Sequence, residues 1–353
     1  MTASKPKALF VYSDRFCTCT MKRCFEVVNG LWRYQNHAVE AAAIHIKNLD
    51  EQHFQTHQVI LFQRLGANGE FLSEETKSNL ENWICRYKDR CRFVYDIDDF
   101  LFNSQSGYPA TLAKLCHYGL VPNDYLKEQM SKYQKCHVIR THVDTDSILQ
   151  TPKKVHSPVS DIHIGWFSCS ANGIETIKSA IDQIPLKLKS RLKFHLFCDV
   201  VFHDLVKKVI PDTCLNIYPM VSPSEMYSNM LSMQILINPL TLHCLHEERI
   251  GVKQDDFPSL MQGKSEVKYA LAGACSIPLI VTPVDSYQKV IKHKVNGLFA
   301  DTPQEWAEGI IYLAEQPQSA QEIGRKSFED VIKNYSLQRA SKDYADFFLQ
   351  ITG

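Results

Sequence analysis

Short apolar segments alternate with longer amphipathic segments along most of the chain. Short apolar runs bounded by polar residues predict strands, whereas apolar residues three or four positions apart predict helices. The predicted strands are 8–13, 58–63, 92–97, 137–141, 163–168, 194–199, 215–221, 234–240 and 277–283. The predicted helices are 37–49, 73–88, 172–184, 222–233, 265–275, 302–316, 319–335 and 336–352. Repeated alternation of strand and helix predicts an α/β protein whose parallel sheets are covered by helices on both faces.

The strands fall into two series, which predicts two domains. The break between the series is TPKKVHSPVSD (151–161), whose proline, serine and charged residues are typical of a linker. The length of 353 residues also suggests about two domains. We therefore predict one doubly wound domain over residues 1–155 and a second one over residues 156–335.

Composition and charge narrow the function. The chain has 39 basic and 39 acidic residues and no zinc finger or basic recognition helix, which argues against nucleic-acid binding. The N-terminus has a short apolar run, and no run approaches the roughly eighteen residues that span a bilayer, so we expect a cytoplasmic protein. The twelve cysteines are dispersed, and without an export signal they are expected to be reduced and buried.

Two predicted strand ends carry candidate ligand-binding residues. The strand 92–97 leads into Asp96, Asp98 and Asp99, and the strand 163–168 leads into a small-residue turn and a helix that begins at Asn172. Ligands of open parallel sheets bind at the carboxyl ends of the strands, and a helix N-terminus suits an anion. Three aspartates around one apolar residue favour function, although capping or plain solvent exposure is the alternative interpretation.

The segment VYDIDDFLF (94–102) resembles the D-x-D-x-[TV] motif of haloacid-dehalogenase-type phosphatases. The resemblance implies that Asp96 accepts a phosphoryl group and that Asp98 is its acid–base partner. The match fails at Phe100, where threonine or valine is required, and no G-D-x-x-x-D stretch is found downstream. This phosphatase is kept as an alternative function.

A broader resemblance covers most of the chain and is densest over about 160–315. The segment GKSEVKYALAGACSIPLIVTPVDSYQKVIKHKVNGLFADTPQEWAEGIIYL (263–313) is similar to the donor-binding region of "group 1" GT-B glycosyltransferases, polysaccharide-biosynthesis subgroup. That subgroup also has a DIDD-like strand end and an I-G-W-F/S-G-S opening, which match Asp96–Asp99 and Ile164–Ser168. The resemblance implies two Rossmann-like domains that face each other across a cleft. It also implies that the last helix, 336–353, crosses back to the N-terminal domain.

The resemblance also implies roles for particular residues. The donor is a nucleotide sugar, whose diphosphate needs cations and helix-terminal N–H groups, and the predicted donor-binding residues are Ser168, Asn172, Lys264, Ser265, Glu266, Lys268 and Tyr269. Lys264 and Lys268 are expected on one helix face. The acceptor belongs on the N-terminal domain, where Asp96, Asp98 or Asp99 would orient or deprotonate its hydroxyl as the predicted catalytic residues. No metal and no obligatory cofactor are expected.

Two features depart from the family pattern. Leu271 stands where the second glutamate of the E-x7-E pair is expected, and the usual R-x4-K phosphate clamp is not obvious. Arg249 and Lys253, in the polar insertion 241–262, are the candidate substitutes. Cys244, His246 and Glu247 in the same insertion lack the spacing of a zinc site, so a donor-side loop is the preferred interpretation. A non-catalytic relative that binds a sugar nucleotide is therefore a further alternative.

The sequence as a whole predicts a glycosyltransferase. It is expected to move a sugar from a nucleotide donor to a hydroxyl of a glycan or lipid-linked acceptor, in surface-polysaccharide assembly of the capsule or lipopolysaccharide type. The basic stretch PLKLKSRLKFH (185–195) is compatible with peripheral contact to anionic lipid at the inner membrane face. The other interpretation of that stretch is a solvated helix end followed by the next strand.

Overall fold

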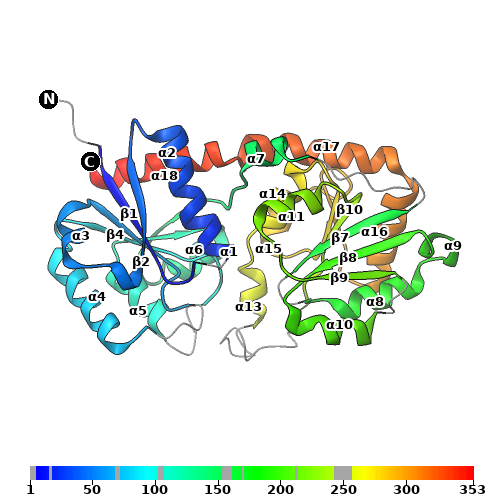
Figure 1. Ribbon diagram of the computed structural model, residues 1–353, viewed down its shortest axis with the longest axis horizontal. Coiled ribbons are helices and arrows are strands. Elements are labelled where there is room, and N and C mark those ends of the chain that lie inside the picture. The colour runs from blue at the N-terminus through cyan, green and yellow to red at the C-terminus, as the bar shows by residue number, and fades with distance from the viewer. Residues whose placement is uncertain are drawn as a thin grey trace. The chain divides into compact units, whose positions relative to one another are not determined.

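Two compact units make up the chain. The computed structural model describes residues 5–15, 18–67, 72–101, 107–152, 161–168, 171–210, 214–241 and 257–353. Unit 1 comprises Met1–Val143, His246–Ser265 and Tyr335–Gly353, and unit 2 comprises Asp144–Leu245 and Glu266–Asn334. Each unit is built on its own parallel sheet with helices on both sides (Figure 1).

The sheet of unit 1 has six parallel strands in the spatial order β2-β1-β3-β4-β5-β6. These strands are β1 (Lys7–Tyr12), β2 (Glu40–His45), β3 (Val59–Gln63), β4 (Arg92–Asp96), β5 (Tyr118–Val121) and β6 (Lys135–Val138). The helices of the unit are α1 (Thr18–Thr20), the π-helical η1 (Met21–Phe25), α2 (Glu26–Gln35), η2 (Ile46–Asn48), α3 (Glu51–Thr56), α4 (Glu74–Tyr87), α5 (Tyr108–Leu115), α6 (Asp124–Met130), α13 (Phe257–Gln262) and α18 (Leu337–Thr352).

The core of unit 1 explains why the last helix belongs to it. Phe10 of β1 lies at ring-centroid distances of 6.2 Å from Tyr344 and 5.9 Å from Phe348, both on α18. These rings join Val27 and Leu31 of α2 in one apolar cluster over the sheet. Because Tyr344, Phe348 and Ile351 recur at helical spacing, α18 presents one continuous apolar face to β1 and α2.

One predicted element of unit 1 is wrong. Residues 37–49 were expected to be helical, but Glu40–His45 is strand β2 and Ile46–Asn48 is a short 3-10 helix. The run of alanines has a high intrinsic helix propensity. Pairing of β2 along the whole of β1 outweighs that propensity. The sequence prediction also missed the helical stretch Thr18–Gln35 and strand β5.

The sheet of unit 2 also has six parallel strands, in the order β12-β11-β10-β7-β8-β9. They are β7 (Ile162–Phe167), β8 (Leu192–Phe197), β9 (Leu215–Tyr218), β10 (Ile235–Asn238), β11 (Leu279–Val281) and β12 (Leu298–Phe299). The helices are α7 (Thr145–Gln150), α8 (Ile174–Gln183), α9 (Leu186–Lys189), η3 (Val200–Phe202), α10 (His203–Val209), α11 (Pro223–Met230), α14 (Val267–Ala274), α15 (Asp285–Val290), α16 (Pro303–Glu315) and α17 (Pro317–Asn334). Trp166 and Trp306 are the largest side chains of its core.

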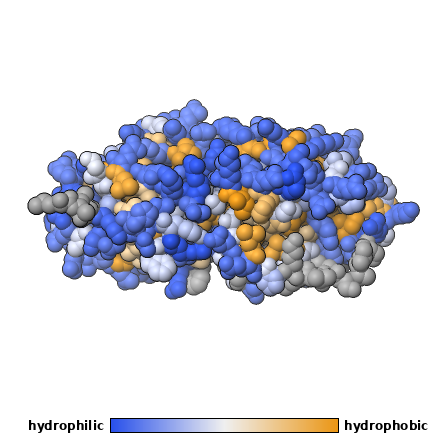
Figure 2. All heavy atoms as spheres, turned by 90° about the horizontal axis from the view of Figure 1, so that it is seen from above, coloured by the Kyte–Doolittle hydropathy of each residue, from blue (hydrophilic) through white to orange (hydrophobic). Residues whose placement is uncertain are grey.

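The outer faces of the long C-terminal helices are polar. Ion pairs at helical spacing, such as Arg325 with Glu322 and Arg339 with Asp343, follow α17 and α18. The space-filling view accordingly shows mostly hydrophilic side chains on the face it presents (Figure 2). None of the helices in the described part of the chain combines the length and the apolar character needed to cross a bilayer.

Candidate functional site

Polar side chains gather at the carboxyl ends of β3 and β4 in unit 1. Arg64 follows β3, and Asp98 and Asp99 follow β4. The Arg64 guanidinium donates from Nη1 to Asp98 Oδ1 and to Asp99 Oδ2, both at 2.8 Å. These side chains are 11–14% exposed, so burial strengthens the ion pairs while leaving an edge open to solvent.

The backbone of Arg64 is strained to reach this position. Arg64 has a φ angle of 53°, in the left-handed region that non-glycine residues seldom adopt. Its backbone N–H donates to the carbonyl oxygen of Asp96 at 2.8 Å, which ties the end of β3 to β4. Strain of this kind persists where the surroundings over-determine it and is concentrated at functional sites. Sequence analysis overlooked Arg64, although an arginine directly after an apolar strand was a usable signal.

Lys264 completes the cluster. Its ammonium group donates to Asp99 Oδ1 at 2.9 Å, and Asn123, the N-cap of α6, holds the adjacent loop by donating to the carbonyl of Gly263 at 3.0 Å. Burial alone would raise the pKa of Asp99, but Lys264 and Arg64 lower it below its usual value. Two carboxylates and two cations therefore form a charge-balanced group in which Asp99 is ionised at neutral pH.

One expectation about Lys264 is wrong. Lys264 and Lys268 were predicted to share a helix face, but α14 begins at Val267, so Lys264 lies in the loop before it. Ser265 lies in the same loop, and both Ser265 and Lys268 are half-buried. The spacing of four residues therefore does not place the two ammonium groups side by side.

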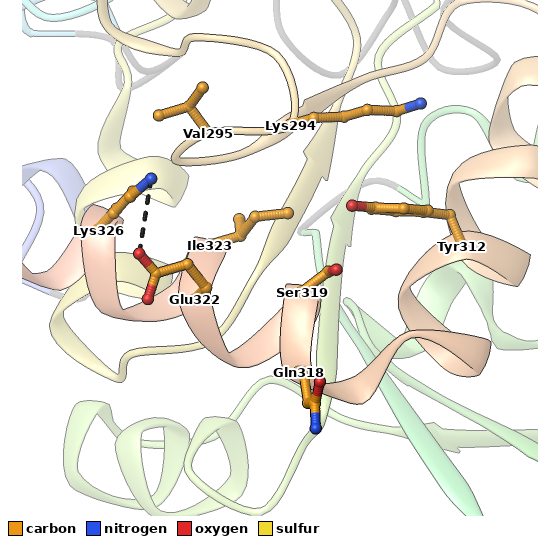
Figure 3. A pocket seen from close by; sticks show the side chains of 8 residues that line it. All are labelled: Lys294, Val295, Tyr312, Gln318, Ser319, Glu322, Ile323 and Lys326. Atoms are coloured by element: carbon orange, nitrogen blue, oxygen red, sulfur yellow. Dashed lines mark ion pairs between the residues drawn. The ribbon is translucent and has the colours of Figure 1, made fainter.

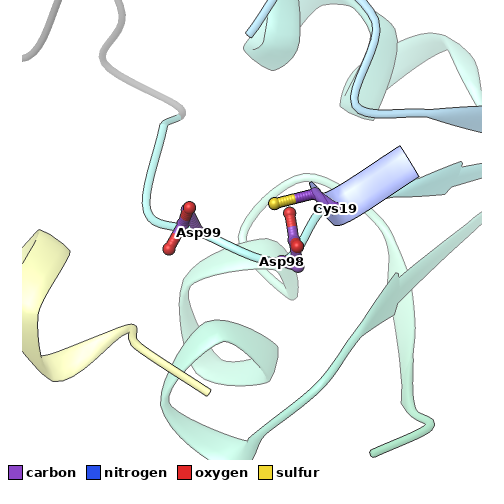
Figure 4. Close-up of side chains that lie close together, drawn as sticks. All are labelled: Cys19, Asp98 and Asp99. Carbon is purple, nitrogen blue, oxygen red and sulfur yellow. The ribbon is translucent and has the colours of Figure 1, made fainter. Parts of the chain in front are cut away.

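Cys19, Asp98 and Asp99 are close enough together to be compared with a metal site. Their ligand atoms lie within 4.8 Å of one another (Figure 4). Arg64 Nη1 lies among them, at 3.0 Å from the Cys19 sulfur and 2.8 Å from each carboxylate. Because a guanidinium already supplies the positive charge at the centre of this set, we assign no metal to it.

Asp96 is separated from its two neighbours. Its carboxyl group is fully buried and accepts a hydrogen bond from Arg23 Nε at 2.7 Å. It accepts a second, longer one from the hydroxyl of Tyr344 on α18 at 3.4 Å. Arg23 comes from η1 and also donates to the carbonyl of Ile139 at 3.1 Å. Burial raises the pKa of Asp96 to about 6, although Arg23 acts in the opposite direction. Asp96 thus connects β4, η1 and α18 inside unit 1, rather than lining its surface.

A second buried ionic group lies near Arg23. Lys22, also on η1, pairs with Glu26 at 2.7 Å, and His142 Nε2 lies 3.3 Å from the other oxygen of Glu26. Burial lowers the pKa of His142, while Glu26 acts to raise it. The π-helical turn is what directs both Lys22 and Arg23 inward, a feature that the sequence pattern did not reveal.

In unit 2, the turn between β7 and α8 contains two of the predicted donor-binding residues. The Asn172 side-chain oxygen accepts hydrogen bonds from the backbone and the hydroxyl of Thr241, both at 2.8 Å. Gly173, the N-cap of α8, has a φ angle of 86°, and a Cβ there would lie 2.6 Å from Pro239. The backbone N–H of Ser168 donates to the carbonyl oxygen of Phe197 at 3.0 Å. This turn is therefore built against the end of β10.

The predicted residues of α14 have different environments. Glu266 is the N-cap residue and is 1% exposed. Tyr269 is fully buried, donating from its hydroxyl to Asp330 at 2.7 Å and accepting from Asn296 at 2.8 Å. Its contacts join α14 to α17, which suits support of the fold. Leu271, at the position of the missing glutamate, is buried in the interior. Arg249, Lys253 and the insertion around them (242–256) lie outside the described residues.

A pocket of about 280 Å³ lies elsewhere in unit 2. It is lined by Lys294, Val295, Tyr312, Gln318, Ser319, Glu322, Ile323 and Lys326 (Figure 3). The end of α16 and the start of α17 form it, at the amino edge of the sheet. Lys294 lies over the Tyr312 ring at 5.0 Å, and Lys326 pairs with Glu322 at 3.5 Å. The pocket contains none of the predicted site residues.

Solved structures establish the fold class. No protein-family model and no curated protein sequence matches the chain. HepE from Anabaena, in complex with UDP-glucose, is similar with a TM-score of 0.69 at 12% identity, over 98% of this chain and 99% of that chain. A glycosyltransferase from Rickettsia africae is similar with 0.69 at 13% identity, over 98% of each chain. Sucrose-phosphate synthase from Thermosynechococcus elongatus is similar with 0.65 at 12% identity, over 99% of each chain. The predicted two-domain α/β GT-B fold is confirmed.

Proposed function

We propose that the chain is a glycosyltransferase that moves a sugar from a nucleotide-sugar donor to an acceptor hydroxyl. The observation that carries the proposal is the charge-balanced group of Arg64, Asp98, Asp99 and Lys264 at the carboxyl edge of a parallel sheet. The GT-B fold supports it, since several similar structures contain UDP or UDP-glucose. The acceptor class that we propose, a glycan or lipid-linked hydroxyl in surface-polysaccharide assembly, rests on the sequence resemblance.

The acceptor side is assigned to Asp98 and Asp99 of unit 1. A general base works best when its pKa is near the working pH, but Arg64 and Lys264 lower the pKa of Asp99. We therefore assign these carboxylates to accepting a hydrogen bond from the acceptor hydroxyl and orienting it. The hydroxyl oxygen then bonds to the anomeric carbon as the bond between that carbon and the diphosphate oxygen breaks. The nucleoside diphosphate leaves with the electron pair, and one of its phosphate oxygens takes up the proton of the hydroxyl.

The donor side is assigned to unit 2 and to Lys264. Lys268, Ser265, Glu266 and the β7–α8 turn are the proposed contacts of the nucleotide sugar, as the resemblance implies. An ammonium group has three N–H donors, and Lys264 uses one of them to donate to Asp99. Lys264 is therefore equipped to donate to a phosphate oxygen while it holds Asp99. Arg249 and Lys253 are retained as the proposed phosphate clamp.

The phosphatase alternative is disfavoured by the surroundings of Asp96. A phosphoryl-accepting carboxylate must contact its substrate, whereas Asp96 is 0% exposed and bonded to Arg23. The non-catalytic alternative makes a different prediction, because such a relative would bind a donor without turning it over.

The test is a thermal-shift screen against UDP, GDP, CDP, ADP and dTDP, followed by a donor-turnover assay. A nucleotide at a hundredfold over its Kd should stabilise the native state by about 2.7 kcal/mol. We expect one nucleotide to raise the Tm of the wild type but not of Lys268→Ala, with Lys292→Ala, an exposed lysine elsewhere in unit 2, as the matched control. Lack of any response would contradict the proposal, and binding without turnover would favour the non-catalytic relative.

A further inference from the structure

A basic surface with an apolar tip lies at the amino edge of the unit 2 sheet. The short helix α9 precedes β8 there, and α10 ends there before β9 begins at Leu215 (Figure 1). Leu188 of α9 is buried and anchors the helix, whereas Leu186 projects outward with 84% of its surface exposed. No other large apolar side chain in the described part of the chain is as exposed. A leucine held out in this way gains nothing from folding.

Basic residues are frequent in the elements beside this leucine. They come from α9, from β8 and its approach, and from the last turn of α10: Lys187, Lys189, Arg191, Lys193, Lys207 and Lys208. Backbone hydrogen bonds hold these elements together. The N–H of Ile162 donates to the carbonyl of Arg191 at 2.8 Å, and the N–H of Phe194 donates to the carbonyl of Cys214 at 2.7 Å. Burial raises the pKa of the Cys214 thiol, and Lys189 and Lys193 both act to lower it, as expected of ammonium groups close to the start of β9.

The end of α8 and the segment before β7 add two acidic residues to this part of the edge, among the described residues. Asp182 at the end of α8 pairs with Lys178 at 2.8 Å and more distantly with Lys189 at 3.6 Å. Asp161 precedes β7 at the same edge. Among the described residues of these elements, the five lysines outnumber these two carboxylates, so this part of the edge is net positive.

We propose that this surface docks the protein on an anionic lipid membrane, with Leu186 inserted between headgroups and the lysines of α9, β8 and α10 on the lipid phosphates. Membrane binding strengthens with buried apolar area and with attraction to anionic lipid, and clusters of four to eight Lys and Arg are typical of lipid-binding surfaces. A nucleic acid would use the charge but not an exposed leucine, and the described residues of this surface offer no exposed aromatic ring for base stacking.

The test is co-sedimentation with vesicles of phosphatidylcholine alone and of phosphatidylcholine with phosphatidylglycerol. We expect the wild type to bind the anionic vesicles, and binding to weaken as salt screens the charges. Lys187→Gln with Lys208→Gln should weaken binding by roughly fivefold per lysine removed, and Leu186→Ser by roughly tenfold. The matched controls are Leu149→Ser, since Leu149 is 62% exposed on α7, and Lys292→Gln with Lys333→Gln.

Three outcomes would overturn the proposal. One is equal binding to both kinds of vesicle or to neither, and another is equal weakening by the control variants. The third is binding to heparin or RNA that is weakened by the lysine substitutions but not by Leu186→Ser. That result would assign the surface to another polyanion. Vesicle binding is measured without sugar transfer, and Leu186→Ser should keep its nucleotide-induced thermal shift. Failure of the docking proposal is therefore distinguishable from failure of the proposed transferase activity.

Discussion

Replacement of Arg23 by methionine tests the role of the buried ion pair with Asp96. Arg23 is 1% exposed and Asp96 is fully buried, with 2.7 Å between Arg23 Nε and the carboxylate. Arg23→Met leaves the carboxyl group in the interior without its cation. Because Arg23 is the main influence that lowers the pKa of Asp96, the native-state pKa of Asp96 should rise well above about 6 in the variant.

The expected loss of stability has two parts. Loss of the hydrogen bonds to Asp96 and Ile139 costs about 2 kcal/mol at any pH, at about 1 kcal/mol each. The second part depends on pH. A raised native-state pKa means that the folded protein holds a proton that the unfolded protein releases, so stability is lost as the pH rises through the native pKa. In the wild type this loss of stability is complete near pH 6, the pKa of Asp96. In the variant the free energy of unfolding continues to fall above pH 6, by about 1.4 kcal/mol per pH unit.

The assay is urea unfolding of both proteins between about pH 6 and pH 8. The deficit of Arg23→Met should grow from about 2 kcal/mol to about 5 kcal/mol, which reaches the upper end of the 3–5 kcal/mol typical of a broken buried ion pair. The double variant Arg23→Met with Asp96→Asn should show a deficit that does not change with pH. A pH-independent deficit in the single variant would refute this reasoning. If the double variant stays folded but loses the turnover that Arg23→Met retains, Asp96 belongs in the active site.

Three other predictions follow from the same structure. Asp99→Asn should lower sugar transfer by roughly 10- to 100-fold, the value of a hydrogen bond to a charged group, while the nucleotide-induced thermal shift stays; loss of both would place Asp99 on the donor side. His142→Gln should abolish part of the loss of stability that the wild type shows as the pH falls below about 6.5, because the buried His142 beside Glu26 has a lowered pKa and the native state binds fewer protons than the unfolded state; identical pH profiles of urea unfolding would contradict this. Gly324→Ala should cost about 1–3 kcal/mol, since its Cβ would lie 2.3 Å from the carbonyl oxygen of Ser276; an unchanged Tm would show that α17 and the segment after α14 can move apart.

Local patterns predicted most of the described strands but fewer than half of the described helices, and they failed where tertiary contacts compete with propensity. The strands β1, β3, β4 and β7 to β11 and the helices α4, α8, α11, α16, α17 and α18 lie where the periodicity indicated. The alanine-rich segment 37–49 was assigned to a helix, because its local preference is helical and its pairing with β1 is invisible in the segment itself. Lys264 and Lys268 were placed on one helix face for a similar reason, since a start of α14 at Val267 cannot be read from spacing alone.

The sequence pattern was enough to indicate two series of alternating strands and helices, and therefore two parallel sheets and the carboxyl strand end at which the acidic run lies. Periodicity carries this information because burial of one face imposes it on every strand and helix. The tertiary structure alone decided how the three aspartates differ. Asp96 meets Arg23, 73 positions earlier in the chain, and Tyr344, 248 positions later, whereas Asp98 and Asp99 meet Arg64, and Asp99 also meets Lys264. Burial and partner choice set the charge and the access of each carboxylate, and both depend on residues far apart in the chain that folding brings together.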